Sequence, residues 1–368
     1  MTTIRMAYLD RMYDEIRDSV EPKAIEFLGS SKYILAEYVQ GFERAIAARY
    51  TFPHVAGVAS GTDALMIALR ACGVGPGDGV IVPAFTIFVD GAVVRMLGAV
   101  PQFVDVSEDD FNLDPRMLDA VITPLTKAIV VVHLFGQCAD MRPIVDVARR
   151  RGLPIIEDAC QAIGARYHEA YAGNLGEVGC FSFYPTKNLG GAGDGGLLAT
   201  RSAALFDELK LLHLHGIGSE PYVQDIWAYN SRLDAFQAFW LQAKLPFLDR
   251  WEARRREIAT YYRENVGSAR IRLPRELEGR HHVWHQFTVR VEDREDFRRF
   301  LSRVGIDHTV FYPRILPHQP AYRDLESQQL HRSWPVAESL ARTVVSIPVS
   351  PQLTDAEVEL VVVSLNAY

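Results

Sequence analysis

Short apolar runs alternate with amphipathic stretches along the chain from about residue 54, and this alternation limits the folds open to it. Runs typical of strands occupy residues 54–59, 80–82, 103–106, 129–132 and 153–158. Helical patterns lie between them, over residues 63–71 and 143–151 and in a segment that ends near Gly98. Strands that are apolar along their whole length are buried on both faces, so we predict an α/β fold with a mostly parallel central sheet sandwiched by helices. Such sheets bind ligands beyond the carboxyl ends of their strands.

The pattern changes near residue 245, which indicates two domains. The first 50 residues are predicted to be helical and to join the sheet in a large α/β domain, residues 1–245. Beyond it, residues 251–265, 295–304 and 355–365 fit helices, and residues 284–291 fit a strand. We therefore predict a smaller α+β domain over residues 246–368.

Composition excludes several classes of protein. The 368 residues carry a formal net charge of −7, so no basic surface favours nucleic acid or an anionic membrane. No apolar run approaches the length of a membrane span, and the first residues lack the pattern of a secretion signal. The four cysteines are far apart and form no C-x-x-C pair, which favours reduced thiols in a cytoplasmic protein and no bound metal.

The segment Ser60-Gly61-Thr62-Asp63 follows one predicted strand and opens a predicted helix. Ser60 can cap this helix and Asp63 can reach back to complete the cap, which explains the pair without any ligand. Exposed amides at a helix start, together with the Thr62 hydroxyl, are also suited to hold a phosphate. Both interpretations fit the segment taken alone.

Asp158 ends a strand of apolar residues, where it serves either as a helix cap or as the partner of a cation. An ionised acid in a poorly solvated pocket needs a cationic partner, such as a protonated ring nitrogen. Gln161 follows three residues later, which places the two side chains on neighbouring turns if a helix begins there.

Lys187 stands between an aromatic run, residues 181–184, and a glycine-rich segment, residues 190–196. The chain has six lysines, and the other five lie in helical or edge contexts. Glycines allow the backbone to approach a ligand closely, and aromatic side chains exclude water. Desolvation lowers the pKa of a lysine and frees its amine to form an imine. Lys187 is therefore the predicted nucleophile.

An amine, an acid and a phosphate-binding turn, each placed just after a strand, are the groups that pyridoxal phosphate requires. The amine forms a Schiff base with the cofactor, the acid pairs with its pyridine nitrogen, and the turn holds its phosphate. A glycine-rich loop alone would be weak evidence, but the combination predicts a pyridoxal phosphate site.

Nearly the whole chain resembles the sugar aminotransferases of the DegT/StrS family, which are fold-type-I pyridoxal phosphate enzymes of the aspartate aminotransferase superfamily. The resemblance rests on motifs spread along the sequence, at residues 59–65, 82–86, 133–136, 157–162, 182–190, 193–196, 229–234 and 319–322. It implies the fold of that family, with a large cofactor-binding domain and a small C-terminal one.

The resemblance also implies roles for individual residues. Lys187 would form the Schiff base, Asp158 would pair with the pyridine nitrogen, and Gln161 would bind near the ring oxygen. The phosphate would be held by three residues of the same chain and one residue of the neighbouring subunit, namely Gly61, Thr62 and Ser182 with Asn230 from the neighbour. The enzyme would then be a homodimer with two composite sites.

The implied reaction moves an amino group from glutamate to a keto sugar. The sugar is expected to be carried on a nucleotide and to be aminated at C3 rather than C4, because the residues around Lys187 are more like those of members that aminate at C3. A cyclitol or a free keto sugar as acceptor, and a pyridoxal phosphate-dependent sugar dehydratase, stay open as alternatives. Dehydrating relatives have histidine where this chain has Lys187. A non-catalytic regulator is disfavoured, because the sequence has no DNA-binding helix-turn-helix or basic arm.

Several positions depart from the family pattern in regions that usually contact the sugar or the nucleotide. Ile87 replaces an aromatic residue that stacks on the cofactor ring, and Phe88 is expected to point the other way along a strand. The segments 213–216 and 316–320 also differ, and within them His215 and His318 are the candidate substrate-binding residues.

Overall fold

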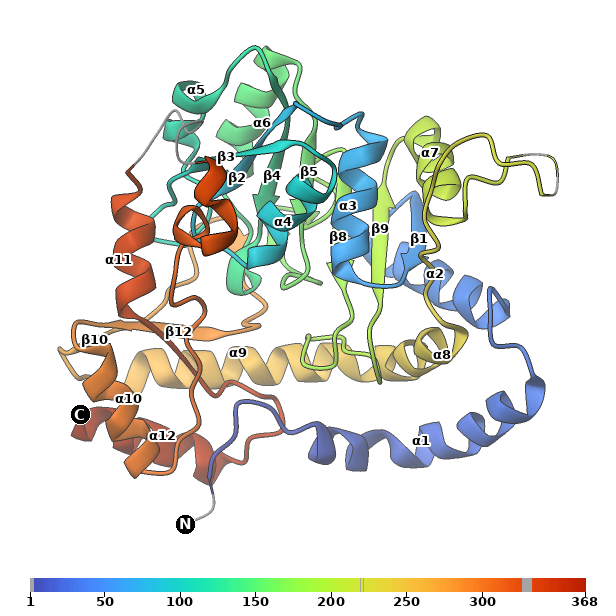
Figure 1. Ribbon diagram of the computed structural model, residues 1–368. Helices are drawn as coiled ribbons and strands as arrows, with labels where there is room; N and C mark the ends of the chain where they lie inside the picture. The colour runs from blue at the N-terminus through green and yellow to red at the C-terminus, as the bar shows by residue number, and fades with distance from the viewer. Residues whose placement is uncertain (1–2, 219, 221, 326–332) are drawn as a thin grey trace.

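The computed structural model describes residues 3–218, 220, 222–325 and 333–368. Within these residues a seven-stranded sheet lies between layers of helices (Figure 1). Its strands are β1 (His54–Val58), β2 (Gly79–Pro83), β3 (Val100–Val104), β4 (Thr126–Val132), β5 (Ile155–Asp158), β8 (Val178–Ser182) and β9 (Gly196–Thr200). They lie in the order β1-β9-β8-β5-β4-β2-β3. β9 runs opposite to all the other strands of this sheet, which are parallel to one another, and this confirms the predicted, mostly parallel arrangement.

Helices cover both faces of the sheet. One face packs against α3 (Gly61–Ala71), α4 (Phe88–Met96), α7 (Ala203–His213) and α11 (Pro335–Thr343). The other face packs against α5 (Leu118–Val121) and α6 (Met141–Arg151). The strands at the β1 end also contact α1 (Leu9–Ser30), α2 (Glu37–Tyr50) and α8 (Ala235–Lys244), so the first 50 residues are largely helical, as predicted.

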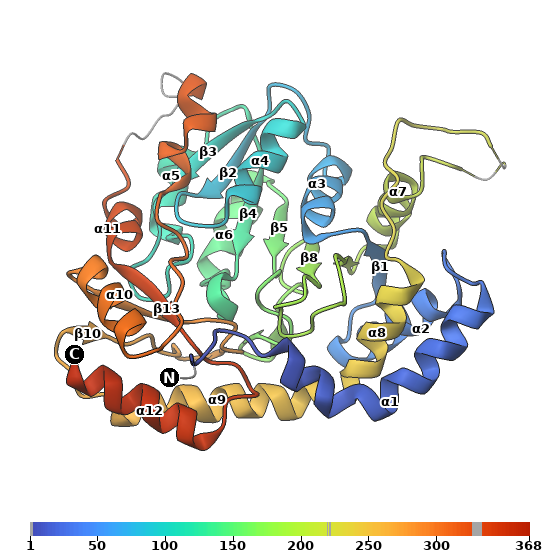
Figure 2. The same ribbon diagram turned by 60° about the horizontal axis from the view of Figure 1, so that its bottom comes forward.

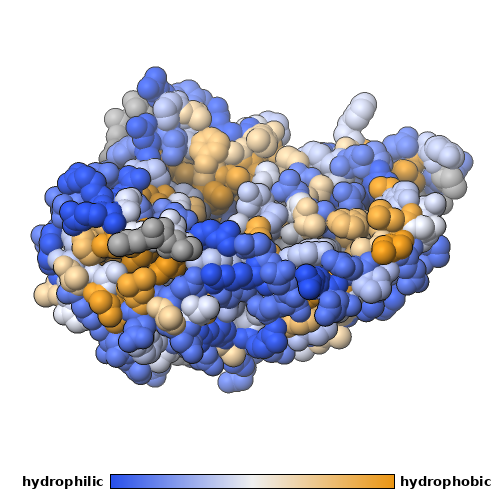
Figure 3. All heavy atoms as spheres, turned by 90° about the horizontal axis from the view of Figure 1, so that it is seen from below, coloured by the Kyte–Doolittle hydropathy of each residue, from blue (hydrophilic) through white to orange (hydrophobic). Residues whose placement is uncertain are grey.

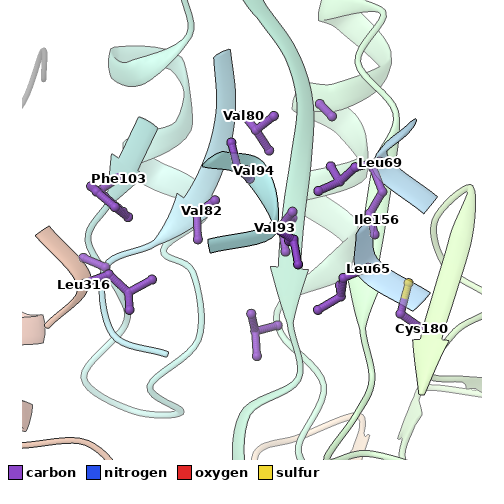
Figure 4. Close-up of a cluster of buried hydrophobic side chains, with 14 of the residues drawn as sticks. Leu65, Leu69, Val80, Val82, Val93, Val94, Phe103, Ile156, Cys180 and Leu316 are labelled. Atoms are coloured by element: carbon purple, nitrogen blue, oxygen red, sulfur yellow. The ribbon is translucent and has the colours of Figure 1, made fainter. Parts of the chain in front are cut away.

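Alternate residues of the central strands point to opposite layers. On β2, Val80 and Val82 belong to the core shared with α3 and α4, whereas Ile81 between them packs with α6. Figure 4 shows Val80 and Val82 beside Val93 and Val94 of α4. Because helices cover both faces, each position along such a strand is buried, which explains its continuous apolar sequence.

The C-terminal part of the chain builds a smaller region around an antiparallel sheet, β10-β12-β13. Its elements are α9 (Leu248–Asn265), β10 (Ile271–Arg272), β12 (Phe287–Val291), α10 (Arg294–Arg303), β13 (Val344–Ile347) and α12 (Asp355–Ala367). Figure 2 shows α9 and α12 side by side along the base of the molecule. A third small sheet and short 3-10 helices complete the described elements: β6 (Arg166–Tyr167), β7 (Ala170–Tyr171), β11 (Arg280–His281), η1 (Pro115–Met117), η2 (Leu134–Gly136), η3 (Leu245–Phe247), η4 (Leu316–His318) and η5 (Pro320–Leu325).

The strand predicted over residues 284–291 starts later, at Phe287. The residues before it pair with the loop after β4 instead. The Val283 N–H donates to the Gly136 carbonyl at 2.9 Å, and the Gln286 N–H donates to the Phe135 carbonyl at 3.2 Å. These bonds to a distant loop replace the strand ladder, and the apolar alternation of the sequence could not reveal them.

The first described residues join the smaller region rather than the large sheet. The Ile4 N–H donates to the Gly305 carbonyl at 2.8 Å, and the Ile4 carbonyl accepts the Asp307 N–H at 2.8 Å. Ile4 and Tyr8 are buried in the same apolar cluster as side chains of α10 and α12. The chain ends accordingly lie at the same end of the molecule (Figures 1 and 2). Helix α11, which follows residue 245, packs on the large sheet, whereas Ile4 and Tyr8, which precede it, pack in the smaller region. The domain boundary at residue 245 therefore stays a prediction.

The surface of the described helices bears on membrane crossing and on contacts with partners. None of these helices combines the length and the apolar character needed to cross a membrane. Seen from below, the surface is largely hydrophilic, with hydrophobic patches toward both ends (Figure 3). The helices of this side carry exposed apolar side chains, among them Ile25 and Leu28 on α1 and Leu360 and Val363 on α12. The predicted cytoplasmic location stays a prediction.

Candidate active site

A cavity of about 290 Å³ opens where β1, β5 and β8 reach their carboxyl ends. Most of the predicted site residues line this cavity. Its lining consists of Ser60, Gly61, Thr62, Leu65, Ile87, Val89, Asp158, Cys160, Gln161, Ser182, Tyr184, Lys187 and Asp194. The cavity therefore brings together the predicted amine, the predicted acid and the helix start. In the part of the chain that the structure describes, no three His, Cys, Asp or Glu side chains form a group that could hold a metal ion.

The start of α3 has the geometry of an anion-binding turn. Ser60 caps the helix, because its Oγ accepts the Asp63 N–H at 3.1 Å. A Cβ on Gly61 would lie 2.8 Å from both Cys160 Sγ and Ser182 Cβ, so only glycine fits there without displacement. The first amides of the helix therefore lie close to Ser182 and open to the cavity.

The predicted reach of Asp63 back to the cap is wrong. Its Oδ2 instead accepts a hydrogen bond from the Ser231 hydroxyl at 2.6 Å. The same Ser231 Oγ accepts the Ala59 N–H at 3.1 Å, so the segment before α8 is joined to the strand end that precedes α3. The hydrogen bond with Ser231, a residue far along the chain, thus takes the place of the predicted local bond.

Asp158 is the last residue of β5 and is 4 % exposed. Its Oδ1 accepts the Cys160 N–H at 2.9 Å, which fixes the carboxylate at the cavity wall. The helix considered after Asp158 does not form, since the chain turns at residues 160–161 and 163–164. Gln161 is held on this turn by two other partners. Its Oε1 accepts the Phe135 N–H at 2.8 Å, and its Nε2 donates to the Tyr312 hydroxyl at 3.2 Å.

Lys187 lies on a tight turn after β8, where its N–H donates to the Tyr184 carbonyl at 2.8 Å. Burial lowers the pKa of the Lys187 amine, and the neighbouring Cys160, Asp158 and Asp90 side chains oppose that shift. A lowered pKa increases the neutral fraction of the amine, which is the nucleophilic form. The structure thus gives Lys187 the desolvated environment that the neighbouring aromatic and glycine residues of the sequence predict.

Asp90 does not line the cavity but interacts with Asp158 in the cavity wall, and the sequence alone did not identify it. It lies in the first turn of α4, is 0 % exposed, and accepts the Thr86 hydroxyl at 2.6 Å through Oδ2. Burial raises the pKa of Asp90 well above its ordinary value, and the nearby Asp158 carboxylate raises it further. An acidic residue in the first turn of the helix that follows a strand was the signal that could have identified it.

Three predicted residues are absent from the cavity lining: Asn230, His215 and His318. Asn230 is exposed, and its Oδ1 accepts the Arg232 Nε–H at 2.9 Å. Arg232 also lies 3.0 Å from Nε2 of His215. His318 Nε2 lies 3.8 Å from a Glu338 carboxylate oxygen. The structure does not bring these three side chains to Lys187 of the same chain.

The pair Ile87 and Phe88 departs from the strand expected there. Ile87 precedes α4 in extended conformation and lines the cavity, whereas Phe88 is the first residue of that helix. Phe88 packs on Tyr322 with ring centroids 5.5 Å apart. The predicted direction of Phe88, away from Ile87, agrees with its absence from the cavity lining. The predicted strand is wrong, because the sheet ends at Pro83 and the chain turns into a helix.

Known proteins resemble this chain over nearly its full length. It is 42% identical to the pleiotropic regulatory protein of Geobacillus stearothermophilus, with 99% of this chain and 98% of the relative covered. It is 40% identical to the UDP-N-acetyl-3-dehydro-alpha-D-glucosamine 3-aminotransferase of Acidithiobacillus ferrooxidans, covering 97% and 95% of the two chains.

Two solved structures have the same fold. The structure of S. venezuelae DesV in complex with a ketimine intermediate matches with a TM-score of 0.95 and 39% identity, covering 100% of this chain and 98% of that one. The structure of NtdA from Bacillus subtilis with bound cofactor PMP matches with a TM-score of 0.91 and 29% identity, covering 99% and 85%. The family model described as the DegT/DnrJ/EryC1/StrS aminotransferase family matches residues 14–366. The predicted fold, cofactor class and enzyme class are thereby confirmed at the level of the family. The chain belongs to the DegT/DnrJ/EryC1/StrS aminotransferase family.

Proposed function

We propose that this protein is a pyridoxal phosphate-dependent enzyme that transfers the amino group of glutamate to C3 of a nucleotide-linked keto sugar. One observation carries the proposal: the Lys187 amine and the Asp158 carboxylate share a cavity with the open helix start at Gly61. The acceptor is inferred from relatives, because the Acidithiobacillus ferrooxidans protein is named for a UDP-linked 3-dehydro sugar and 3-amino transfer.

The donor groups of the cavity fit this cofactor. Because Gly61 has no side chain, nothing at that position covers the backbone amides after Ser60, and these amides can donate hydrogen bonds to a phosphate. The buried Asp158 suits a protonated ring nitrogen, since a carboxylate with little access to water needs a cationic partner. When bound, pyridoxal phosphate supplies an aldehyde carbon for amine exchange and a ring that stabilises negative charge at the reacting carbon.

Lys187 then has two tasks in succession. Its Nζ would first hold the cofactor, and once an amino donor had displaced it, the free amine would move a proton. It would take this proton from the α-carbon of glutamate and deliver it to the cofactor carbon on the other side of the transferred nitrogen. The lowered pKa of Lys187 favours the neutral amine that accepts the proton. Gln161, bonded to Phe135 and Tyr312, is rigid enough to position the ring edge.

We further propose a homodimer in which Asn230 completes the phosphate site of the other subunit. Asn230 lies outside the cavity of its own chain and forms an isolated β-bridge with Leu214, the residue after α7, so it ends a segment that projects beside that helix (Figure 1). The same segment carries Tyr222 and Trp227, which are 92 % and 91 % exposed. Burial of two such side chains against a second copy would remove a large apolar area from water.

The activity is tested with purified protein, pyridoxal phosphate, glutamate and a panel of acceptors, with products read by mass spectrometry. The panel holds 3-keto and 4-keto sugar nucleotides, a free keto sugar and a keto cyclitol. We expect 2-oxoglutarate and a 3-amino sugar nucleotide, and no product from Lys187→Ala. A product that has lost water without gaining an amine would assign a dehydratase instead. Binding of the cofactor without turnover of any acceptor would contradict the proposal.

Shared sites are tested by mixing two inactive variants, Lys187→Ala and Asn230→Ala. A mixed dimer holds one site with both native residues, so activity should return on mixing, while each variant alone stays impaired. Failure of mixing to restore activity, or a monomer by light scattering, would contradict the composite site.

A further inference from the structure

A second buried acid accompanies the predicted partner of the cofactor ring. Asp90 is completely buried in the first turn of α4, and its carboxyl is placed to share a hydrogen bond with that of Asp158 on β5. Among the described residues, one of its oxygens accepts a hydrogen bond, Oδ2 from the Thr86 hydroxyl at 2.6 Å. The other oxygen, Oδ1, is buried, and no N–H or O–H group of the described residues donates a hydrogen bond to it. A buried anionic oxygen without a donor is strongly unfavourable.

A proton on Oδ1 removes this conflict. Two adjacent carboxyls in a site with little water cannot both ionise, so one of them holds a proton at neutral pH. The titratable groups that act on Asp90 are Asp158, Lys187, Tyr312, Tyr322 and Cys180. Burial raises the pKa of the tyrosines and of the Cys180 thiol, so these groups stay neutral at pH 7. Lys187 lowers the pKa of Asp90, but burial and Asp158 raise it by more.

The two acids differ in what else they contact. Asp158 lines the cavity and binds the Cys160 N–H, so its charge can face a ring cation there. Asp90 does not line the cavity, and its one donor is a neutral hydroxyl. The charge is therefore better placed on Asp158 and the proton on Asp90.

We propose that Asp90 is a positioning residue that stays protonated and donates a hydrogen bond from Oδ1 to the Asp158 carboxylate, which fixes that carboxylate for the ring nitrogen. This inference rests on the proposed function, because the ring nitrogen belongs to the bound cofactor. The protonation of Asp90 itself is a property of the protein without cofactor.

The first test therefore uses cofactor-free protein, labelled with ¹³C at the aspartate side-chain carboxyls. At pH 7 we expect one resonance of a protonated carboxyl that is lost in Asp90→Asn and kept in Asp158→Asn. Asp110→Asn is the matched control, since Asp110 is buried but paired with Arg280, and this variant should keep the resonance. Absence of the resonance, its survival in Asp90→Asn, or its loss in Asp158→Asn would overturn the proposal.

The second test measures the pH dependence of kcat/KM in the loaded enzyme. Asp90→Asn retains a donor toward Asp158 and should keep the acid limb of the profile in place. Asp90→Leu removes the donor that fixes the Asp158 carboxylate, so the acid limb should move up by about one pH unit and cofactor affinity should fall about tenfold. Identical profiles for the native protein and Asp90→Leu would overturn the proposal. An inactive protein with the expected carboxyl resonance would count against the proposed function and leave the assignment of Asp90 intact.

Discussion

Lys244 is completely buried and donates a hydrogen bond from Nζ to the backbone carbonyl of Gly190. Gly190 closes the turn that carries Lys187, and a Cβ at Gly190 would lie 2.1 Å from the Pro185 carbonyl oxygen. The face of the Trp251 ring lies 5.6 Å from the same amine. A lysine of α8 thus holds the end of the turn on which the predicted nucleophile lies.

Lys244 should make the free energy of unfolding depend on pH. Burial lowers the pKa of Lys244 from 10.5 to about 7, so between these values the unfolded state binds more protons than the folded state. The contribution of this group to stability is complete above about pH 10.5 and is lost as the pH falls toward 7. Urea unfolding at pH 7 and pH 9 should therefore show a smaller difference in Lys244→Met than in the native protein. Lys210→Met, at an exposed lysine, is the control and should keep the native difference.

Gly61→Ala should weaken cofactor binding by about tenfold or more, because the new methyl group would push against Cys160 and Ser182 and displace the helix start. Titration of the cofactor-free variant with pyridoxal phosphate, followed by absorbance, measures the loss. Gly75→Ala is the matched control, since a Cβ there meets nothing within 4 Å. Equal affinities of the two variants would show that the close approach at Gly61 does not shape the phosphate site.

Lys187→Met should abolish turnover, with a loss of about a thousandfold or more, and should leave the fold intact. Burial already disfavours the charged form of this amine, so its replacement by an apolar side chain removes a desolvation penalty. The unfolding midpoint of the cofactor-free variant should equal or exceed that of the native protein. A clear drop in that midpoint would mean that Lys187 has a structural role as well.

Glu157→Gln should destabilise the protein by about 2–4 kcal/mol. The Glu157 carboxylate is completely buried and accepts the N–H groups of Gly173 at 2.8 Å and Leu175 at 2.7 Å. It also contacts His133 Nε2 at 2.8 Å. An amide in its place would turn an N–H group toward donors that have no other acceptor there. Equilibrium unfolding in urea measures the effect, and a change below about 0.5 kcal/mol would show that the network rearranges around the amide.

The sequence predicts well those features that depend on local periodicity. Continuous apolar runs identify the buried strands, and the residue after each run, such as Asp158, therefore marks the edge where the cavity opens. Glu157 and Asp158 illustrate the rule, since successive residues of β5 point to opposite faces and only Asp158 lines the cavity.

Features that depend on contacts between distant segments escaped prediction. Asp90 and Asp158 meet only because β2 and β5 lie on either side of β4, and no local pattern fixes that order. The partners of Gln161 come from the loop after β4 and from Tyr312, far along the chain. The place of Asn230 depends on a second subunit, so a single chain leaves its predicted role open.

The pairing of Ile4 with Gly305 and Asp307 has a consequence for biosynthesis. During synthesis, the segment around Ile4 finds its backbone partners only once the chain has been translated past Asp307. The large sheet can assemble beforehand, whereas the segment ahead of α1 must wait for the residues that follow α10. A nascent chain stalled before that point would leave Ile4 and Tyr8 uncovered, available to chaperones or to another nascent copy.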